Sequence, residues 1–177
     1  MPSNSSPLKL FTYCPQCGNP GFSADTEKSL KCGDCGFRFF INMTATVVAL
    51  IRNEENELLF TVRKHDPASG MLDLPGGFVD LGETAEQAIV REIKEELNLN
   101  ISKLGFIGTF PNSYLFETVE YSTLNLAFNC TVESFQGLQA ADDVSGYVFR
   151  DPAHVQHKEI GLESIRNIVT HLLSTDN

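Results

Sequence analysis

The stretch G-G-F-V-D-L-G-E-T-A-E-Q-A-I-V-R-E-I-K-E-E-L-N, from Gly76 to Asn98, decides the organisation of this chain. Its glycine pair predicts a turn, and the residues from about Thr84 to Leu97 predict a helix. Thr84 and Gln87 have the spacing of a capping box, in which each side chain accepts a hydrogen bond from the main-chain N–H of the other. Apolar residues at helical spacing predict the buried face: Ala85, Ala88, Ile89, Ile93 and Leu97.

Three glutamates of this helix lie on one face, because residues three and four apart are neighbours on a helix surface. They are Glu92, Glu95 and Glu96. Like charges at this spacing cost about 0.2–0.5 kcal/mol per pair. A divalent cation would remove that cost, and carboxylate oxygens are the ligands that Mg²⁺ and Mn²⁺ prefer. We therefore predict a metal site here. The alternative is a solvated helix face, which we prefer for Glu86.

The composition is that of a globular protein with a core. The chain has 177 residues, of which 42% are hydrophobic, enough for one domain and a small appendage. A net charge of −10 argues against a nucleic-acid polymer as partner, since such proteins carry a basic face. No apolar run approaches the ~20 residues of a membrane span, and residues 1–10 lack the apolar segment of a secretory signal. We expect no membrane partner and a cytoplasmic location.

Four of the five cysteines form two C-x-x-C-G motifs, which contain Cys14 and Cys17, and Cys32 and Cys35. Two tight turns would present four thiolates, the ligand set of a tetrahedral Zn²⁺ site with no open position. Rubredoxin-like iron, two disulfides and a redox motif are the alternatives. Disulfides fit a cytoplasmic chain poorly, and a redox motif requires a βαβ pattern that this segment lacks. We predict a structural zinc site, and we expect the fifth cysteine, Cys130, to be a buried apolar residue.

The chain divides by composition into three parts. We expect a flexible tail over residues 1–9, a zinc ribbon over 10–41 and a larger domain over 42–177. Strands are expected at Thr44–Ile51, Leu58–Arg63, Met71–Leu74, Ile101–Thr109, Tyr121–Val132 and Tyr147–Phe149, and a second helix at Ile160–Leu173. The first two strands suggest a hairpin. This order of strands and helices predicts an α/β fold with a mixed sheet covered on both faces.

From Gly77 to Leu99 the sequence has the pattern G-x5-E-x7-R-E-I-K-E-E-L-N-L, which resembles the Nudix box, G-x5-E-x7-R-E-U-x-E-E-x-G-U, where U is aliphatic. Asn98 replaces the last glycine, at a position past the helix that requires the left-handed conformation; asparagine is the next best residue there. The resemblance implies an α/β/α sandwich that hydrolyses a nucleoside diphosphate linked to another group. It also implies that Glu83 pairs with Arg91, which orients the helix.

The resemblance further implies a Mg²⁺ or Mn²⁺ site. Glu92, Glu95 and Glu96 would bind the metal, with the Gly76 carbonyl as a further ligand, and either Glu92 or Glu96 would activate water. Family members often recruit an acidic residue from a later segment, for which Asp143 is the candidate ligand. The chemistry agrees, because divalent cations neutralise a diphosphate and lower the pKa of bound water, while a carboxylate takes the proton.

A zinc ribbon before a Nudix domain resembles the NADH pyrophosphatase branch. Of that branch's S-Q-P-W-P-F-P-x-S marker only F-P-x-S remains, from Phe110 to Ser113, and the chain has no tryptophan. The favoured substrate is therefore a small-molecule nucleotide, NADH, NAD⁺ or ADP-ribose, while another dinucleotide or a nucleotide sugar stays open. The rival class is a nucleotide-metabolite sensor without hydrolysis, whose ribbon contacts a partner.

Residues outside the box are expected to choose the substrate. Phe110 and Tyr114 are candidates to stack on a base, which is worth ~1–3 kcal/mol in nucleic-acid proteins, and Ser113 and Glu159 are candidate polar contacts. The alternative for the aromatic residues is packing at a sheet edge or in a dimer contact. Many family members are dimers, so a homodimer is compatible with the resemblance.

Overall fold

The computed structural model describes residues 6–175, so the first five residues of the expected tail lie outside the described part. The chain forms two compact units. The first contains Met1–Met43 and Ser113–Ser122, and the second contains Thr44–Asn112 and Thr123–Asn177.

The first unit contains a small antiparallel sheet in the order β1-β2-β3. Its strands are β1 (Phe22–Thr26), β2 (Ser29–Cys32) and β3 (Arg38–Phe40), none of which the sequence analysis predicted. A short 3-10 turn, η1 (Pro7–Lys9), falls within the expected tail, and its Leu8 is buried in the core of this unit with Phe22 and Leu30. The four cysteines of the two motifs lie together, in the arrangement of a zinc ribbon. A few apolar side chains, together with the buried Cys14 and Cys32, thus make up this core.

The second unit contains two sheets. The four-stranded sheet has the order β7-β4-β9-β8, in which β4 pairs parallel with β9 and antiparallel with β7. Its strands are β4 (Thr44–Ile51), β7 (Gly76–Phe78), β8 (Ile101–Phe116) and β9 (Val119–Val132), and the tip shared by β8 and β9 belongs to the first unit. The three-stranded sheet has the order β10-β5-β6, with β5 (Leu58–Arg63), β6 (Leu72–Asp73) and β10 (Val144–Arg150).

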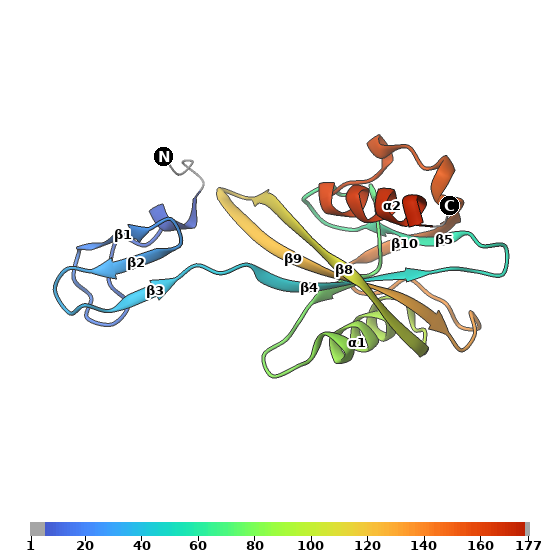
Figure 1. Cartoon of the computed structure of the whole chain (residues 1–177), viewed down its shortest axis with the longest axis horizontal. Coiled ribbons are helices and arrows are strands. Elements are labelled where there is room, and N and C mark those ends of the chain that lie inside the picture. Colours follow the sequence, from blue (N-terminus) through green and yellow to red (C-terminus); the bar gives the residue numbers. More distant parts are fainter. Residues whose placement is uncertain (1–5, 176–177) are drawn as a thin grey trace. The chain divides into compact units, whose positions relative to one another are not determined.

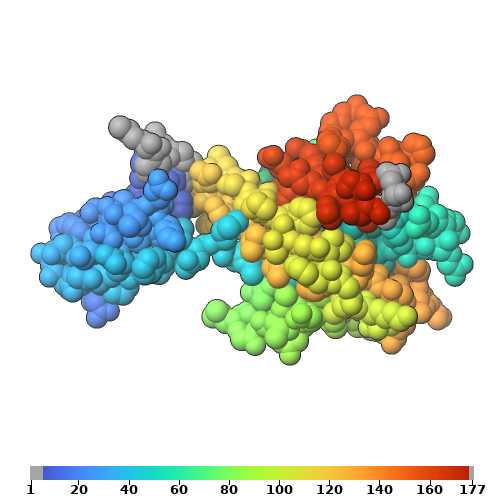
Figure 2. All heavy atoms as spheres, in the orientation of Figure 1, coloured from blue at the N-terminus to red at the C-terminus, as the bar shows by residue number. Residues whose placement is uncertain are grey.

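Two helices cover opposite faces of the four-stranded sheet (Figure 1). Helix α1 (Ala85–Leu97) packs its Ala88, Ile89 and Ile93 against Val47 and Ala49 of β4. Helix α2 (Glu163–Thr175) packs against the alternate residues of β4, and Figure 2 shows its atoms (red) lying against the yellow segment of β8. Two 3-10 turns, η2 (Pro152–His154) and η3 (His157–Glu159), precede α2. The architecture is therefore the predicted α/β/α sandwich with a mixed sheet.

Strand β4 occupies the centre of the second unit because its inner residues are apolar on both faces. Five consecutive residues of this strand, Val47–Ile51, are buried. Such a strand needs a neighbour on each side, and these are β7 and β9. The predicted hairpin of Thr44–Ile51 with Leu58–Arg63 is wrong, because the two strands belong to different sheets and meet only in an isolated bridge between Arg52 and Leu58.

Helix boundaries follow local sequence signals. Thr84 caps α1 with the predicted capping box to Gln87. Helix α2 begins at Glu163, three residues after the predicted Ile160, because Ile160 bridges to Leu72 of β6 instead. Among residues 6–175, neither these helices nor the short turns have the length and apolar character to span a membrane.

Asn98 ends helix α1 in the predicted left-handed conformation, with φ 54° and ψ 30°. Its side chain accepts a hydrogen bond from Lys94 Nζ at 2.8 Å and donates one to the Gly137 carbonyl at 3.1 Å. Asparagine therefore replaces the family's glycine at small cost, since it tolerates this backbone conformation and adds two hydrogen bonds.

We expect Asn98→Ala to lower the free energy of unfolding by about 1–2 kcal/mol, because alanine fits the left-handed region poorly. Asn98→Gly keeps the backbone conformation and loses only the side-chain hydrogen bonds, so its loss should be smaller. Urea unfolding of both variants measures the difference. An alanine variant as stable as the glycine variant would contradict this explanation.

Candidate active site

The carboxylate site is built where the β7 main chain meets helix α1. A Cβ at Gly77 would lie 2.4 Å from the Glu92 carboxylate carbon, so a side chain there would displace the carboxylate. Gly76 has φ 149°, and a Cβ on it would lie 2.0 Å from the Val47 carbonyl oxygen of β4. The Gly76 N–H donates to Glu96 Oε2 at 3.0 Å. The glycine pair predicted as a turn is thus a strand that brings its main chain onto the helix carboxylates.

Glu96 is the most buried of the three glutamates, with 7% of its surface exposed. Burial raises its pKa to about 8, the Gly76 N–H opposes this, and the charges of Glu92, Asp73 and Asp143 raise it further. Burial also raises the pKa of Glu92, against the effect of the Arg91 side chain. The protein therefore places several acidic groups where the ionised forms are poorly solvated, which is the environment that a bound cation would stabilise.

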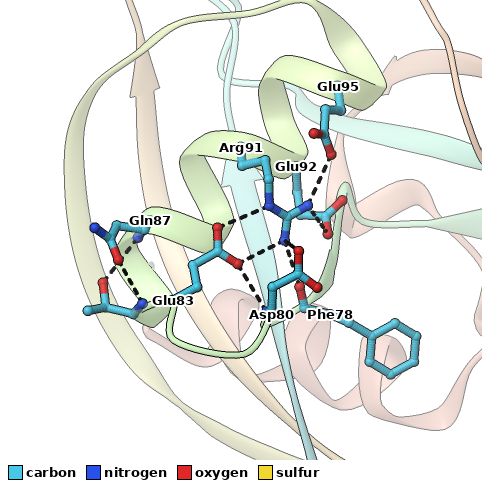
Figure 3. Close-up of polar contacts among 8 residues, drawn as sticks. Phe78, Asp80, Glu83, Gln87, Arg91, Glu92 and Glu95 are labelled. Carbon is cyan, nitrogen blue, oxygen red and sulfur yellow. Dashed lines mark hydrogen bonds and ion pairs between the residues drawn. The ribbon is translucent and has the colours of Figure 1, made fainter.

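Arg91 donates to three of the acidic side chains of this site (Figure 3). Its Nε and Nη2 contact the two oxygens of Glu83 at 3.0 and 2.9 Å, and Nη2 also donates to the Phe78 carbonyl at 2.9 Å. Its Nη1 contacts Glu92 Oε1 at 2.8 Å and Glu95 Oε2 at 3.0 Å. These carboxylates, Glu83 first, raise the pKa of Arg91, so it remains a cation throughout the physiological range.

Glu83 forms the pair with Arg91 that the resemblance implied. It also accepts a hydrogen bond from the Asp80 N–H at 3.0 Å, so it joins the loop before α1 to the helix. The Arg91 hydrogen bonds, and then the Asp80 N–H, lower the pKa of Glu83. The pair of Glu83 and Arg91 therefore holds the loop and the helix together beside the carboxylates that Arg91 contacts, and it does not contact the buried Glu96.

The donor atoms of the site suit Mg²⁺ or Mn²⁺, since they are carboxylate oxygens. Within residues 6–175, the four thiols of the ribbon are the only group of three or more Cys, His, Asp or Glu side chains close enough to share a metal ion, with all ligand atoms within 4.8 Å. The glutamates are divided instead, because Glu92 and Glu95 contact Arg91 while Glu96 contacts the Gly76 N–H. The ligand chemistry fits a divalent cation, and Arg91 is the positive charge now between two of the ligands.

The segment carrying Asp143 is attached to the carboxyl end of α1. The Ala141 N–H donates to the Glu96 carbonyl at 2.8 Å. The Asp143 carbonyl accepts a hydrogen bond from the Lys64 N–H at 3.0 Å, and its exposed carboxylate lies 3.7 Å from His65 Nε2. The charge of Asp143 acts on the Glu96 carboxyl. The structure thus brings this segment to the end of the helix that carries the glutamates, while the role of Asp143 as a ligand stays a prediction.

Asp73 and Arg63 form a buried ion pair that the sequence analysis missed. Asp73 is 8% exposed; burial raises its pKa, and Arg63 opposes that rise. Its charge also acts on Glu96. Alternation along a strand places Asp73 on the face opposite Leu72 and Leu74, so the sequence favoured an exposed residue here, and the pair depends on Arg63 of β5.

Phe110 and Glu159 have partners within the second unit. The ring of Phe110 packs edge-on against His171 of α2, with 5.6 Å between ring centroids. The Glu159 carboxylate accepts a hydrogen bond from the Gln156 N–H at 2.9 Å. Within residues 6–175, no hydrogen bond or ion pair joins Glu159 to the α1 glutamates. Substrate contact by either residue stays a prediction.

Ser113 and Tyr114 lie at the tip of the β8–β9 hairpin, in the first unit. Ser113 Oγ donates to Glu120 at 2.9 Å, and Tyr114 stacks on Tyr121 with 6.0 Å between centroids. These two contacts join residues of the tip, and the role of Ser113 and Tyr114 in substrate binding stays a prediction.

Phe78 is an exposed aromatic residue beside the site that the sequence analysis did not select. It is 49% exposed and pairs with Thr46 of β4, and its carbonyl accepts from Arg91. In Figure 3 its ring points away from the glutamates. The sequence shows an aromatic residue directly after the glycine pair, but whether its ring is exposed depends on the pairing of β7 with β4.

Comparisons with solved structures agree with the fold. A NUDIX hydrolase from Nitrosomonas europaea superposes with a TM-score of 0.66 at 20% identity, covering 89% of this chain and 87% of that one. The NUDIX domain of Shewanella oneidensis NrtR, complexed with ADP ribose, superposes with a TM-score of 0.64 at 19% identity, covering 78% and 91% of the two chains. At these identities the likeness is one of fold.

Comparisons of sequence give the family. NAD-capped RNA hydrolase NudC of Vibrio atlanticus is 31% identical over 99 residues, which are 56% of this chain and 36% of the relative. The Haemophilus influenzae protein of the same name is 31% identical over 113 residues, 61% of this chain and 43% of the relative. The chain thus spans less than half the length of these curated relatives. The NUDIX domain profile matches residues 42–171, most of the chain, and the chain therefore belongs to the Nudix family.

Proposed function

We propose that this chain is a Mg²⁺- or Mn²⁺-dependent pyrophosphohydrolase that cleaves a nucleoside diphosphate linked to another group, with NADH, NAD⁺ or ADP-ribose as favoured substrates. The observation that carries the proposal is the approach of Gly76 and Gly77 to helix α1, which fixes Glu96 and crowds Glu92. Carboxylates held in this way suit phosphoryl chemistry, because the reaction needs concentrated oxygen ligands and a proton acceptor.

Each residue of the site has a distinct task in this proposal. Glu92, Glu95, Glu96 and the Gly76 carbonyl would hold the cation, which when bound neutralises the diphosphate and lowers the pKa of the attacking water. Burial raises the pKa of Glu92 and of Glu96, which makes the ionised form of each a stronger proton acceptor, so both remain candidates for the base.

The substrate proposal draws support from what the compared proteins share. The curated relatives are named for hydrolysis of NAD-capped RNA, and the NrtR domain was solved with ADP ribose. A bifunctional NMN adenylyltransferase/ADP ribose pyrophosphatase from Francisella tularensis is also similar, at 25% identity and a TM-score of 0.57, covering 77% of this chain and 42% of that one. These ligands all contain an ADP group joined through a diphosphate. We assign the exposed ring of Phe78 as a candidate surface for a base.

The first test is hydrolysis of a substrate panel with Mg²⁺ or Mn²⁺: NADH, NAD⁺, ADP-ribose, NAD-capped RNA, a nucleotide sugar and a nucleoside triphosphate. We expect NADH, NAD⁺ or ADP-ribose to yield two monophosphates, measured by chromatography. NAD-capped RNA tests the prediction that no nucleic-acid polymer binds, which rests on the net charge of −10. Tight binding of a metabolite without turnover of any compound would favour the sensor alternative.

The second test separates Glu96 from its helix neighbours. Glu96→Gln should lower kcat by about 10²–10⁴-fold while the protein stays folded, since the substitution removes a ligand and a proton acceptor. Glu86→Gln is the matched control, because Glu86 lies in the first turn of the same helix, and it should keep wild-type activity. Circular dichroism checks the fold of both variants. Activity of Glu96→Gln close to wild type would refute the proposed role.

We also propose a structural zinc ion in the ribbon. Cys14 Sγ lies 3.7 Å from Cys35 Sγ, and Cys17 Sγ lies 3.7 Å from Cys32 Sγ. Four sulfurs at ~2.3 Å around a tetrahedral Zn²⁺ would be about 3.8 Å apart, which these two pairs match, and all four sulfurs lie within 4.8 Å of one another. Four unoxidised thiols also agree with the cytoplasm as the proposed location.

Metal analysis of the purified protein tests this site. We expect about one zinc per chain in the wild type, a clear loss in Cys17→Ser, and no change in Cys130→Ser, because Cys130 is buried outside the ribbon. Iron in place of zinc would support the rubredoxin-like alternative. A wild-type protein that binds neither metal would remove the claim.

A further inference from the structure

The guanidinium group of Arg91 has two sides with different partners (Figure 3). The side formed by Nε and Nη2 makes a double hydrogen bond with Glu83 and a third bond with the Phe78 carbonyl. The remaining nitrogen, Nη1, contacts only Glu92 and Glu95. We call the first side, which contacts Glu83 and the Phe78 carbonyl, the clasp.

Nη1 contacts two of the carboxylates that the proposed divalent cation would need. Glu92 and Glu95 are two of the three glutamates assigned to the cation, and each gives one oxygen to Nη1, at 2.8 and 3.0 Å. Two carboxylates that contact the same cationic nitrogen are partly neutralised. A divalent cation that binds these two oxygens has to take them from Arg91, while the second oxygen of each carboxylate has no contact with Nη1.

The exchange does not require the arginine to leave its place. The clasp keeps the guanidinium against Glu83 and the loop before α1, whatever Nη1 contacts. The Glu95 side chain can turn away instead, because it is 48% exposed, whereas the Glu92 side chain is 13% exposed and has less freedom. The contacts of the clasp and those of Nη1 can thus change independently of each other.

We propose that Arg91 is a positioning residue with an exchangeable half: Nη1 neutralises Glu92 and Glu95 until a divalent cation takes their oxygens, while the clasp on Glu83 stays closed. This inference rests on the proposed metal site. Arg91 then has two opposite effects: it holds the loop to helix α1, and it competes with the metal for Glu92 and Glu95. The residue stabilises the metal-free protein more than the metal-bound protein, and by thermodynamic linkage it weakens metal binding.

A purely structural role gives a different expectation. If Arg91 acts only through the clasp, its removal destabilises the metal-free and metal-bound forms equally, and the affinity for metal stays the same. If Arg91 steers the glutamates toward the metal, its removal weakens the affinity. Exchange predicts that a variant without the guanidinium binds metal more tightly, and by more than the loss of another positive charge from the same helix would cause.

The test measures the Kd for Mn²⁺ by electron paramagnetic resonance, with no substrate, on the full chain and on Arg91→Gln. We expect Kd to fall about threefold to tenfold, the range for loss of one or two competing ion pairs. Urea unfolding with EDTA and with saturating Mn²⁺ should show a larger stabilisation by Mn²⁺ in the variant than in the wild type. Arg91→Lys is the second variant if Arg91→Gln folds poorly, because one ammonium group at Glu83 cannot also contact Glu92 and Glu95.

Lys94→Gln is the matched control. It removes one positive charge from the same helix, where Lys94 Nζ contacts Asn98, and so measures the general effect of charge on Mn²⁺ affinity. Its Kd should change less than that of Arg91→Gln. An unchanged or weaker affinity in both Arg91 variants, or an equal gain in Lys94→Gln, overturns the exchange. A wild-type protein that binds no Mn²⁺ overturns the proposed metal site together with it.

Discussion

The second unit depends on one constraint: the main chain of Gly76 and Gly77, which have no side chains, lies directly against helix α1. Gly76 must lie against the Val47 carbonyl to pair β7 with β4, and Gly77 must lie against the Glu92 carboxylate to let α1 approach. A side chain at Gly76 would meet the main chain of β4 and push the edge strand away from the central strand, whereas one at Gly77 would displace the Glu92 carboxylate. The sheet and the carboxylate site are therefore one structure, and neither can change without the other.

The same approach creates an electrostatic problem that two arginines reduce. Glu96, Glu92 and Asp73 lie in a poorly solvated region, where burial raises the pKa of each. Arg63 neutralises Asp73 on one side, and Arg91 contacts Glu92 on the other. Glu96 receives only a main-chain N–H, so no cation offsets the effect of burial, and its pKa rises to about 8. The protein accepts this local cost at the place where the proposed chemistry needs unsatisfied oxygen ligands.

Local sequence signals predicted what depends on neighbouring residues. The capping box at Thr84 and the left-handed Asn98 involve residues close in sequence, and both are present; the pairing of Glu83 with Arg91, which the resemblance to the Nudix box implied, is present as well. Features that depend on distant segments were missed. Strand β4 pairs with β9 in a parallel register, Thr44 opposite Thr123, which turn and strand signals do not encode, and so it was assigned to a hairpin with its sequence neighbour.

The β8–β9 hairpin has its strands in one compact unit and its tip, Ser113–Ser122, in the other. The first unit is thus assembled from two separate pieces of sequence, of which the amino-terminal piece carries all four clustered cysteines. Cutting the gene after Met43 would therefore not divide the protein into its two units. The shortened chain would retain the aromatic residues of the tip without the partner segment, so separating the ribbon cleanly requires a second cut that shortens the hairpin.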